Sequence, residues 1–295
     1  MNVNNKDSVW HPIPTGIYNM LKVQYFSLHL FFWLSLVPLN GYTVSKYQVM
    51  TYNILSDDNL KYGNYDKLPE KIISWDIRKT KIAKIICKSS VDLVFLQETN
   101  LSACNYFKNK LTKDGYDGVC GTDLALFYKK NRFTVVGDQN ISLKVGKPSH
   151  EVRIQDKNNN IKFQLINVHI KWDNKEPKQH FGCQQLNMLK EHLSKYTWEN
   201  QYVIIAGDFN LPPHHTCLKD ISNFFANSLE HDEQASFLGS TGPARIDYIF
   251  GSKRLITKTL TSKVEMHHST LLPNITHPSD HLPIFAELVL NEIKD

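Results

Sequence analysis

Short apolar runs recur along the chain after about residue 45, and several of them end at a polar or charged residue. Runs of four to eight residues rich in Val, Ile and Phe are typical of buried strands. Six such runs carry chemically capable side chains in or beside them: 49–55 with Asn53, 91–98 with Glu98, 163–169 with His169, 202–210 with Asp208 and Asn210, 245–250 with Asp247, and 284–290 directly after Asp280 and His281. Because buried charge is costly unless it is paired or metal-bound, we expect these side chains to converge on one site.

Helical spacing appears between these runs. Residues 77–86 have apolar side chains near a helical period, with Lys and Arg predicted on the other face, and further helices are predicted at 102–113, 183–196 and 220–228. Additional strands are predicted at 124–129 and 133–136, and a hairpin turn at 156–160. Many strands interleaved with a few helices favour a layered α/β or α+β protein, with two sheets packed face to face and helices outside.

The first 44 residues differ from the rest. No Asp, Glu, Lys or Arg lies between Lys22 and Lys46, and the apolar core Leu28–Leu39 is shorter than the ~20 residues of a standard spanning helix. Three readings stay open: a signal peptide or short anchor, a packed or amphipathic extension, and a non-native start or poorly ordered tail. We expect the extension at 1–44 and one folded domain at 45–295, in the cytoplasm, unless 25–39 act as a signal or contact a membrane.

Composition adds only a few constraints on the substrate and on the cysteine chemistry. The chain has 295 residues, 41% hydrophobic and 21% charged, with a net charge of +5, which is compatible with an anionic substrate. Five scattered cysteines without a C-x-x-C pair argue against a disulfide framework and a structural zinc site. Three sequons, at Asn100, Asn140 and Asn274, are about what chance gives in an asparagine-rich chain.

In order along the chain, the motifs resemble those of the endonuclease/exonuclease/phosphatase superfamily, with the deoxyribonuclease I-like fold. They are Thr51-Tyr52-Asn53-Ile54-Leu55, Leu96-Gln97-Glu98-Thr99, Asn167-Val168-His169, Gly207-Asp208-Phe209-Asn210, Arg245-Ile246-Asp247-Tyr248-Ile249 and Ser279-Asp280-His281-Leu282-Pro283. The resemblance implies a four-layered α/β sandwich with two mainly antiparallel sheets. The finer match is to the branch of the deadenylases, nocturnin and the 2′-phosphodiesterases, although Gly182 stands where that branch often has Arg.

The resemblance implies a divalent-metal phosphodiesterase with Mg²⁺, or alternatively Mn²⁺, as cofactor. Oxygen ligands suit Mg²⁺, and Glu98 is the best candidate ligand, supported by Asn53 and Asp280. By the same resemblance Asp208 handles the attacking water, Asn210 and His169 hold the phosphate, and Asp247 orients His281. Each residue taken singly could have a simpler role, such as a turn-capping Asp or a surface His. These simpler roles are less favoured because all of the motifs occur in one chain. Six of the histidines outside the motifs (His180, His214, His215, His267, His268 and His277) are interpreted as surface residues.

The predicted function is hydrolysis of RNA by a monomeric 3′-exonuclease of deadenylase type. The alternatives are a DNA repair-type endonuclease or phosphodiesterase, a phosphohydrolase acting on phosphoinositides or sphingomyelin, and a catalytically silent binding module. Substrate choice is expected to reside in the loops 56–74, 171–182 and 211–220. There the aromatic side chains of Tyr62, Tyr65 and Trp172 could either stack on bases or anchor the loops.

Overall fold

The apolar runs form two six-stranded sheets. The computed structural model describes residues 45–174, 179–195, 202–222, 225–227, 234–260 and 271–290. The first sheet has the order β13 (Leu255–Leu260), β14 (Ile284–Leu290), β1 (Lys46–Asn53), β2 (Leu93–Gln97), β4 (Leu124–Lys129) and β3 (Tyr116–Cys120). The second has the order β5 (Phe133–Ile141), β6 (Ser149–Asp156), β7 (Lys162–His169), β8 (Tyr202–Asp208), β12 (Asp247–Ser252) and β9 (Phe225–Asn227). A separate hairpin pairs β10 (Phe237–Gly239) with β11 (Gly242–Ala244).

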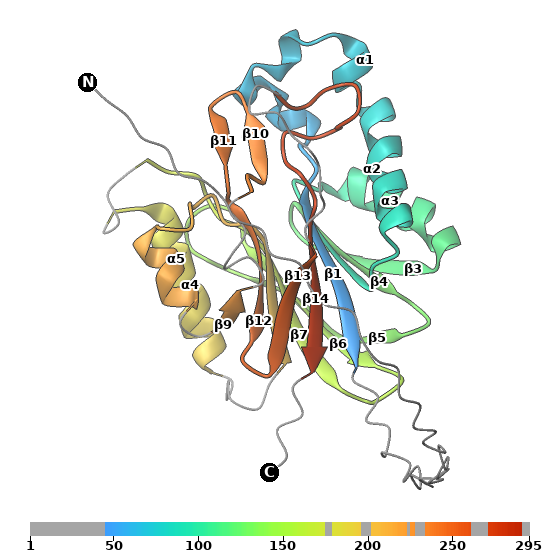
Figure 1. Ribbon diagram of the computed structural model, residues 1–295, viewed down its shortest axis with the longest axis vertical. Helices are drawn as coiled ribbons and strands as arrows, with labels where there is room; N and C mark the ends of the chain where they lie inside the picture. The colour runs from blue at the N-terminus through green and yellow to red at the C-terminus, as the bar shows by residue number, and fades with distance from the viewer. Residues whose placement is uncertain are drawn as a thin grey trace, which may run out of the picture. The chain divides into compact units, whose positions relative to one another are not determined.

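Helices cover the outer face of each sheet (Figure 1). Helices α2 (Trp75–Ser89) and α3 (Leu101–Leu111) pack on the first sheet through Ile82, Ile86 and Phe107, whereas α4 (Phe181–Ser194) and α5 (Thr216–Ser222) pack on the second. Shorter turns of helix are η1 (Asp57–Gly63), η2 (Tyr65–Lys67), α1 (Glu70–Ile73) and η3 (Thr112–Asp114). The helix–sheet–sheet–helix layers confirm the predicted α/β sandwich.

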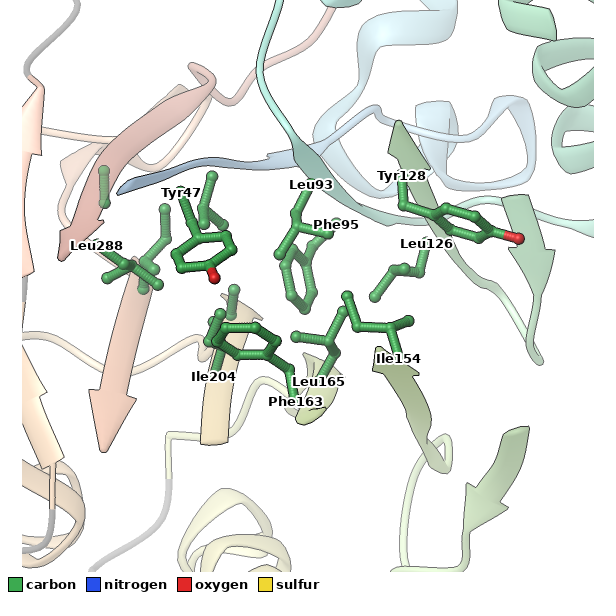
Figure 2. Packing of buried hydrophobic residues seen from close by; sticks show 14 of the residues in the cluster. Tyr47, Leu93, Phe95, Leu126, Tyr128, Ile154, Phe163, Leu165, Ile204 and Leu288 are labelled. Atoms are coloured by element: carbon green, nitrogen blue, oxygen red, sulfur yellow. The ribbon is translucent and has the colours of Figure 1, made fainter. Parts of the chain in front are cut away.

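The central core lies between the two sheets (Figure 2). Side chains on alternate positions of a strand face opposite ways. In β1, Tyr47 and Val49 therefore join this core, whereas Met50 and Tyr52 face the helices. Two buried amides also join the sheets here: Gln97 Nε2 donates to Asn167 Oδ1 at 2.8 Å, and Asn167 Nδ2 donates to the carbonyl oxygens of Leu96 and Ala125. These bonds satisfy polar groups that would be costly to bury alone.

Each sheet contains one parallel strand pair in a mainly antiparallel order. The pair β1–β2 is connected through α2, and the pair β7–β8 through α4. Parallel strands end at the same edge of a sheet, so these pairs bring four strand ends together. Asp247, the first residue of β12, lies directly opposite Asp208 at the end of β8. The topology therefore gathers the polar strand ends predicted from the sequence.

Local boundaries differ from the sequence-based predictions in several places. The predicted helix at 220–228 lies at Thr216–Ser222 instead, and residues 225–227 form β9. The segment 56–74, named above as a loop, contains η1, η2 and α1. Arg78 was predicted on the polar face of α2, but its side chain is fully buried. Arg78, Ile82 and Ile86 are spaced four residues apart and so share one face of the helix, which is the face that packs on the sheet.

The expectation about cysteine pairing was wrong. Cys104 in α3 is bonded to Cys120 at the end of β3, and Cys183 in α4 is bonded to Cys217 in α5, while Cys87 is free. The pairs are 16 and 34 residues apart in sequence. They meet only because separate elements pack together, which cysteine spacing cannot reveal.

No helix within the described residues is long and apolar enough to cross a membrane. The predicted extension at 1–44 and the expected membrane contact through 25–39 lie outside the described residues.

Candidate active site

The side chain of Asp208 lies at the centre of the polar strand ends. Its Oδ2 is 3.6 Å from His169 Nε2 and 3.7 Å from His281 Nε2, and it accepts a hydrogen bond from Asn53 Nδ2 at 3.0 Å. Burial raises the pKa of Asp208 to about 6, and Asp247 adds to this, while the two histidines and Asn53 oppose it. A carboxyl group whose pKa lies just below neutrality can accept and return a proton during a reaction.

His281 is held by Asp247 from the opposite sheet. Asp247 Oδ2 is 2.8 Å from His281 Nδ1, and both residues are buried. Burial alone would lower the pKa of His281, but Asp247, Asp208 and Asp280 raise it well above its ordinary value. The imidazole therefore remains protonated near neutral pH and directs its Nε2–H toward Asp208 and the site, since Nδ1 is engaged by Asp247.

Glu98 and Asn53 form the second acidic part of the site. Asn53 Nδ2 donates to Glu98 Oε1 at 3.1 Å, and the backbone N–H of Ser56 and the amide of Asn59 donate to Oε2. Burial opposes ionisation of Glu98, but His169 and these hydrogen bonds outweigh it and lower its pKa. Glu98 is thus an ionised carboxylate 8% exposed at the site.

Asp280 completes this part of the site. The hydroxyl of Ser279 donates to the carbonyl oxygen of Asn53 at 2.7 Å, which fixes the turn that carries Asp280 and His281 next to the end of β1. Burial raises the pKa of Asp280, and the charge of Glu98 raises it further. Glu98 and Asp280 therefore resist being ionised at the same time, and a bound cation would stabilise both carboxylates.

Together these residues form an acidic cluster with the oxygen donors that a divalent cation prefers. Asp208, Asp247 and His281 offer ligand atoms within 4.8 Å of one another. Asp247 and His281 are already hydrogen-bonded to each other, whereas Glu98, Asn53 and Asp280 carry further oxygen atoms in the same site. The donor set fits a hard divalent ion.

The backbone is strained where it presents these groups. Glu98 and Asn210 have φ of 59° and 49°, in the left-handed region that residues other than glycine uncommonly adopt. Asn210 keeps its place because its N–H donates to Asp208 Oδ1 at 2.9 Å and its amide donates to the carbonyl oxygen of Ile170. Gly207 has φ of 151°, and a Cβ there would lie 2.0 Å from the carbonyl oxygen of Val168. Only glycine lets β8 approach β7 closely enough to present Asp208.

Comparisons with known proteins show the family of this chain. Residues 50–281 match the model of the Endonuclease/Exonuclease/phosphatase family. The chain belongs to this family. It is 25% identical to Carbon catabolite repressor protein 4 homolog 3 of Arabidopsis thaliana, over 65% of this chain and 46% of that protein. It is also 25% identical to Nocturnin of Mus musculus, over 84% of this chain and 66% of that protein. The chain thus spans about half to two thirds of the length of these curated relatives.

Solved structures share the fold of this member of the Endonuclease/Exonuclease/phosphatase family. ANGEL2, described as a 2′,3′-cyclic phosphatase and solved with adenosine-2′,3′-vanadate, has a TM-score of 0.73 at 18% identity, covering 84% of this chain and 97% of that one. The human Nocturnin catalytic domain with bound sulfate has a TM-score of 0.62 at 23% identity, covering 83% and 95%.

Arg78 supports the site of this family member but belongs to none of the sequence motifs. Its guanidinium donates to the carbonyl oxygens of Ile54, Leu55 and Pro278. It therefore joins the segment after Asn53 to the turn before Asp280. The signal in the sequence was its position on the same helical face as Ile82 and Ile86.

A cavity of about 410 Å³ opens beside His281 and Asn210. Trp172, His180, His215 and Phe237 contribute to its lining. His180 was predicted at the surface, but it is 3% exposed because it caps α4 by accepting from the N–H of Gly182. Burial and the neighbouring histidines lower the pKa of His215, so its imidazole is neutral near pH 7.

The aromatic side chains named as alternatives for base stacking divide into two groups. Tyr65 is buried, and its hydroxyl oxygen accepts from the N–H of Ser240, which makes it an anchor between η2 and the β10–β11 hairpin. Trp172 is 65% exposed and lines the cavity, so its ring is accessible to a ligand. Tyr62 is exposed but does not line the cavity.

Proposed function

We propose that this domain hydrolyses phosphodiester bonds in RNA with a divalent metal ion, Mg²⁺ or alternatively Mn²⁺, as a 3′-exonuclease of deadenylase type. The observation that carries the proposal is Asp208, a buried carboxyl group lying between two imidazoles and tied through Asn53 to Glu98. Phosphodiester hydrolysis needs a base for water and positive groups for the phosphate oxygens, and this arrangement provides both. The relatives named as exoribonuclease subunits and nocturnin support RNA as the substrate.

The chain's own residues divide the reaction between them. Asp208, with a pKa of about 6, is mostly ionised at neutral pH and takes the proton of the attacking water. His281 donates through Nε2 to a phosphate oxygen, because its Nδ1–H donates a hydrogen bond to Asp247. His169, whose Nε2 lies 3.6 Å from the same oxygen of Asp208, is the second imidazole donor, and the second amide N–H of Asn210 is left for the phosphate after the first bonds to Ile170.

The metal ion would be held by Glu98, with Asn53 and Asp280 around it, and when bound it supplies positive charge to the phosphate and to the leaving oxygen. Glu98 is fixed for this role by three donors, from Ser56, Asn59 and Asn53, which orient both carboxylate oxygens before any substrate arrives. Such fixed polar groups need little reorganisation during the reaction.

A 5′-labelled oligo(A) tests the proposal. We expect a ladder that shortens one nucleotide at a time from the 3′ end, is abolished by EDTA and is restored by added Mg²⁺ or Mn²⁺, whose relative rates identify the preferred ion. Glu98→Gln removes the carboxylate and should abolish the ladder. The matched control is Glu287→Gln. Glu287 lies on β14 and pairs with Lys46 of β1, so this change should leave the rate unchanged.

Several outcomes would contradict the proposal. Cleavage that survives chelation, or that Glu98→Gln leaves intact, would rule out the metal-dependent mechanism. Products of internal cleavage would indicate an endonuclease. A parallel panel of DNA, RNA ending in a 2′,3′-cyclic phosphate, a phosphoinositide and sphingomyelin would show whether a substrate other than oligo(A) is preferred.

A further inference from the structure

Four of the five cysteines are paired in two separate parts of the fold. One bridge joins α3 to β3 beside the first sheet, and the other joins α4 to α5 beside the second. Their Cα–Cα distances of 6.0 and 5.4 Å lie within the range that a disulfide requires. Two independent pairs, one in each helical layer, match the cysteine usage of proteins that fold under oxidising conditions.

Packing alone does not account for these pairs. Cys104 and Cys183 are buried, and a buried free cysteine often serves simply as a small apolar side chain. Their partners Cys120 and Cys217 are partly buried at the margins of the helix-facing cores, where any apolar side chain could pack. Packing against a core therefore does not explain why a second cysteine meets each buried one. Cys87, which has no cysteine partner, supplies an internal reference for a reduced thiol.

The sequons provide a second, independent observation. Asn100 and Asn140 are exposed, and Asn274 is partly exposed. Asn274 uses its side-chain oxygen to accept from the N–H groups of Thr276 and His277, which leaves its nitrogen, the atom that carries an N-linked glycan, outside these bonds. Asn140 lies on β5, an edge strand, where a bulky polar group also protects against pairing with another chain.

We propose that this chain matures in an oxidising compartment of the secretory pathway, where both disulfides form and at least one of the three sequons receives an N-linked glycan. The uncharged apolar stretch Leu28–Leu39 provides a sequence suited to entry into that pathway. The proposal is independent of the phosphodiesterase activity, and it replaces the cytoplasmic location favoured by the sequence analysis.

The chemistry of both modifications balances. For each bridge, one cysteine thiolate attacks the disulfide of a thiol oxidoreductase, and the second cysteine resolves the mixed disulfide. The oxidoreductase leaves as a dithiol, carrying two electrons and two protons. For the glycan, Nδ2 of the asparagine loses a proton and bonds to C1 of a lipid-diphosphate-linked oligosaccharide, and the C1–O bond to the lipid diphosphate breaks.

The test uses the full chain expressed in eukaryotic cells. Cells are lysed in acid to trap the thiols, and the denatured protein is alkylated with N-ethylmaleimide before and after reduction. Of the five cysteines, four are bridged, so intact mass should show one label before reduction, at Cys87, and five labels after it. Five labels before reduction would overturn the proposal whatever the state of the sequons.

Glycan occupancy is read from the same protein. Treatment with an amide-cleaving glycosidase should lower the mass by at least one N-linked oligosaccharide, and the triple variant N100Q/N140Q/N274Q should not respond. One label without any glycosidase shift would overturn glycosylation while supporting the oxidised state. Peptide mapping under non-reducing conditions then identifies the pairs, and any pairing other than Cys104–Cys120 and Cys183–Cys217 would contradict the structure.

Discussion

Replacing Asp247 by Asn tests the pairing that orients His281. The two groups are buried, and their 2.8 Å contact joins a carboxylate to a protonated imidazole. Asn keeps the shape but removes the charge, and its amide nitrogen can donate to Nδ1, which stabilises the wrong tautomer. We therefore expect a folded protein whose His281 has a lower pKa and a poorly directed Nε2 proton.

The expected loss of activity follows from the strength of this contact. A hydrogen bond to a charged group contributes about 1.5–3 kcal/mol, and about 1.4 kcal/mol corresponds to tenfold in rate. The variant should therefore lose about 10- to 150-fold in kcat on oligo(A). Because the wild-type pairing raises the pKa of His281, the alkaline limb of the pH–rate profile should move to lower pH in the variant.

The same change has a predictable effect on stability. A histidine whose pKa is raised in the folded state stabilises it below the unfolded pKa of about 6.5, and this contribution is lost as pH rises through the folded pKa. Denaturant titrations should therefore show a gap between wild type and variant that is largest below about pH 6.5 and narrows at alkaline pH.

Asp156→Asn is the matched control. Asp156 is also fully buried and paired, with Arg132 at 3.0 Å, but it lies at the end of β6 farther from the site. It should lower stability and leave the pH–rate profile in place. An Asp247→Asn enzyme with wild-type kcat and an unshifted alkaline limb would refute the assigned role of His281.

Three further changes give separate readouts. Arg78→Met leaves backbone carbonyl groups without their donor, so it should lower the free energy of unfolding by about 3 kcal/mol and reduce kcat. The neighbouring change Lys79→Met should do neither. Urea titration and oligo(A) assays distinguish the two variants. Trp172→Ala removes a ring that can stack on a base, an interaction that contributes about 1–3 kcal/mol of binding free energy per base. KM should therefore rise about 5- to 150-fold with kcat nearly unchanged. An unchanged KM would show that the ring does not touch the substrate. The double variant C183S/C217S removes a disulfide between residues 34 apart, and by the chain-entropy relation its free energy of unfolding should fall by about 3–4 kcal/mol. Its KM should rise, because His215 in the cavity wall lies two residues from the disulfide. A KM equal to wild type would show that the disulfide does not support the cavity.

The strand ends were predictable because a buried strand that ends in a charged residue is unusual. Asp208 follows an apolar run, and Glu98 follows one that ends with Gln97. The cost of burying their charge points to a shared site. The four-layered sandwich followed from the family resemblance as much as from the pattern of strands and helices.

Features that depend on contacts distant in sequence could not be predicted in the same way. Cys183 and Cys217 meet because α4 and α5 pack together, and no local pattern encodes that distance. The short segment at 225–227 is a strand because it pairs with β12, although nearby residues have helical character. Arg78 could have been identified from its helical face, but a buried arginine contradicts the usual preference for charge at the surface.

The buried amides of Gln97 and Asn167 have a consequence for how the protein should respond to heat. They fix one sheet against the other, while the site draws Asn53 and Glu98 from the first sheet and His169, Asp208 and Asp247 from the second. A sliding movement of the sheets by a fraction of a strand spacing would separate these halves with every strand intact. Thermal inactivation should therefore precede the loss of secondary structure, and the rate of hydrolysis becomes a sensitive gauge of the contact between the sheets.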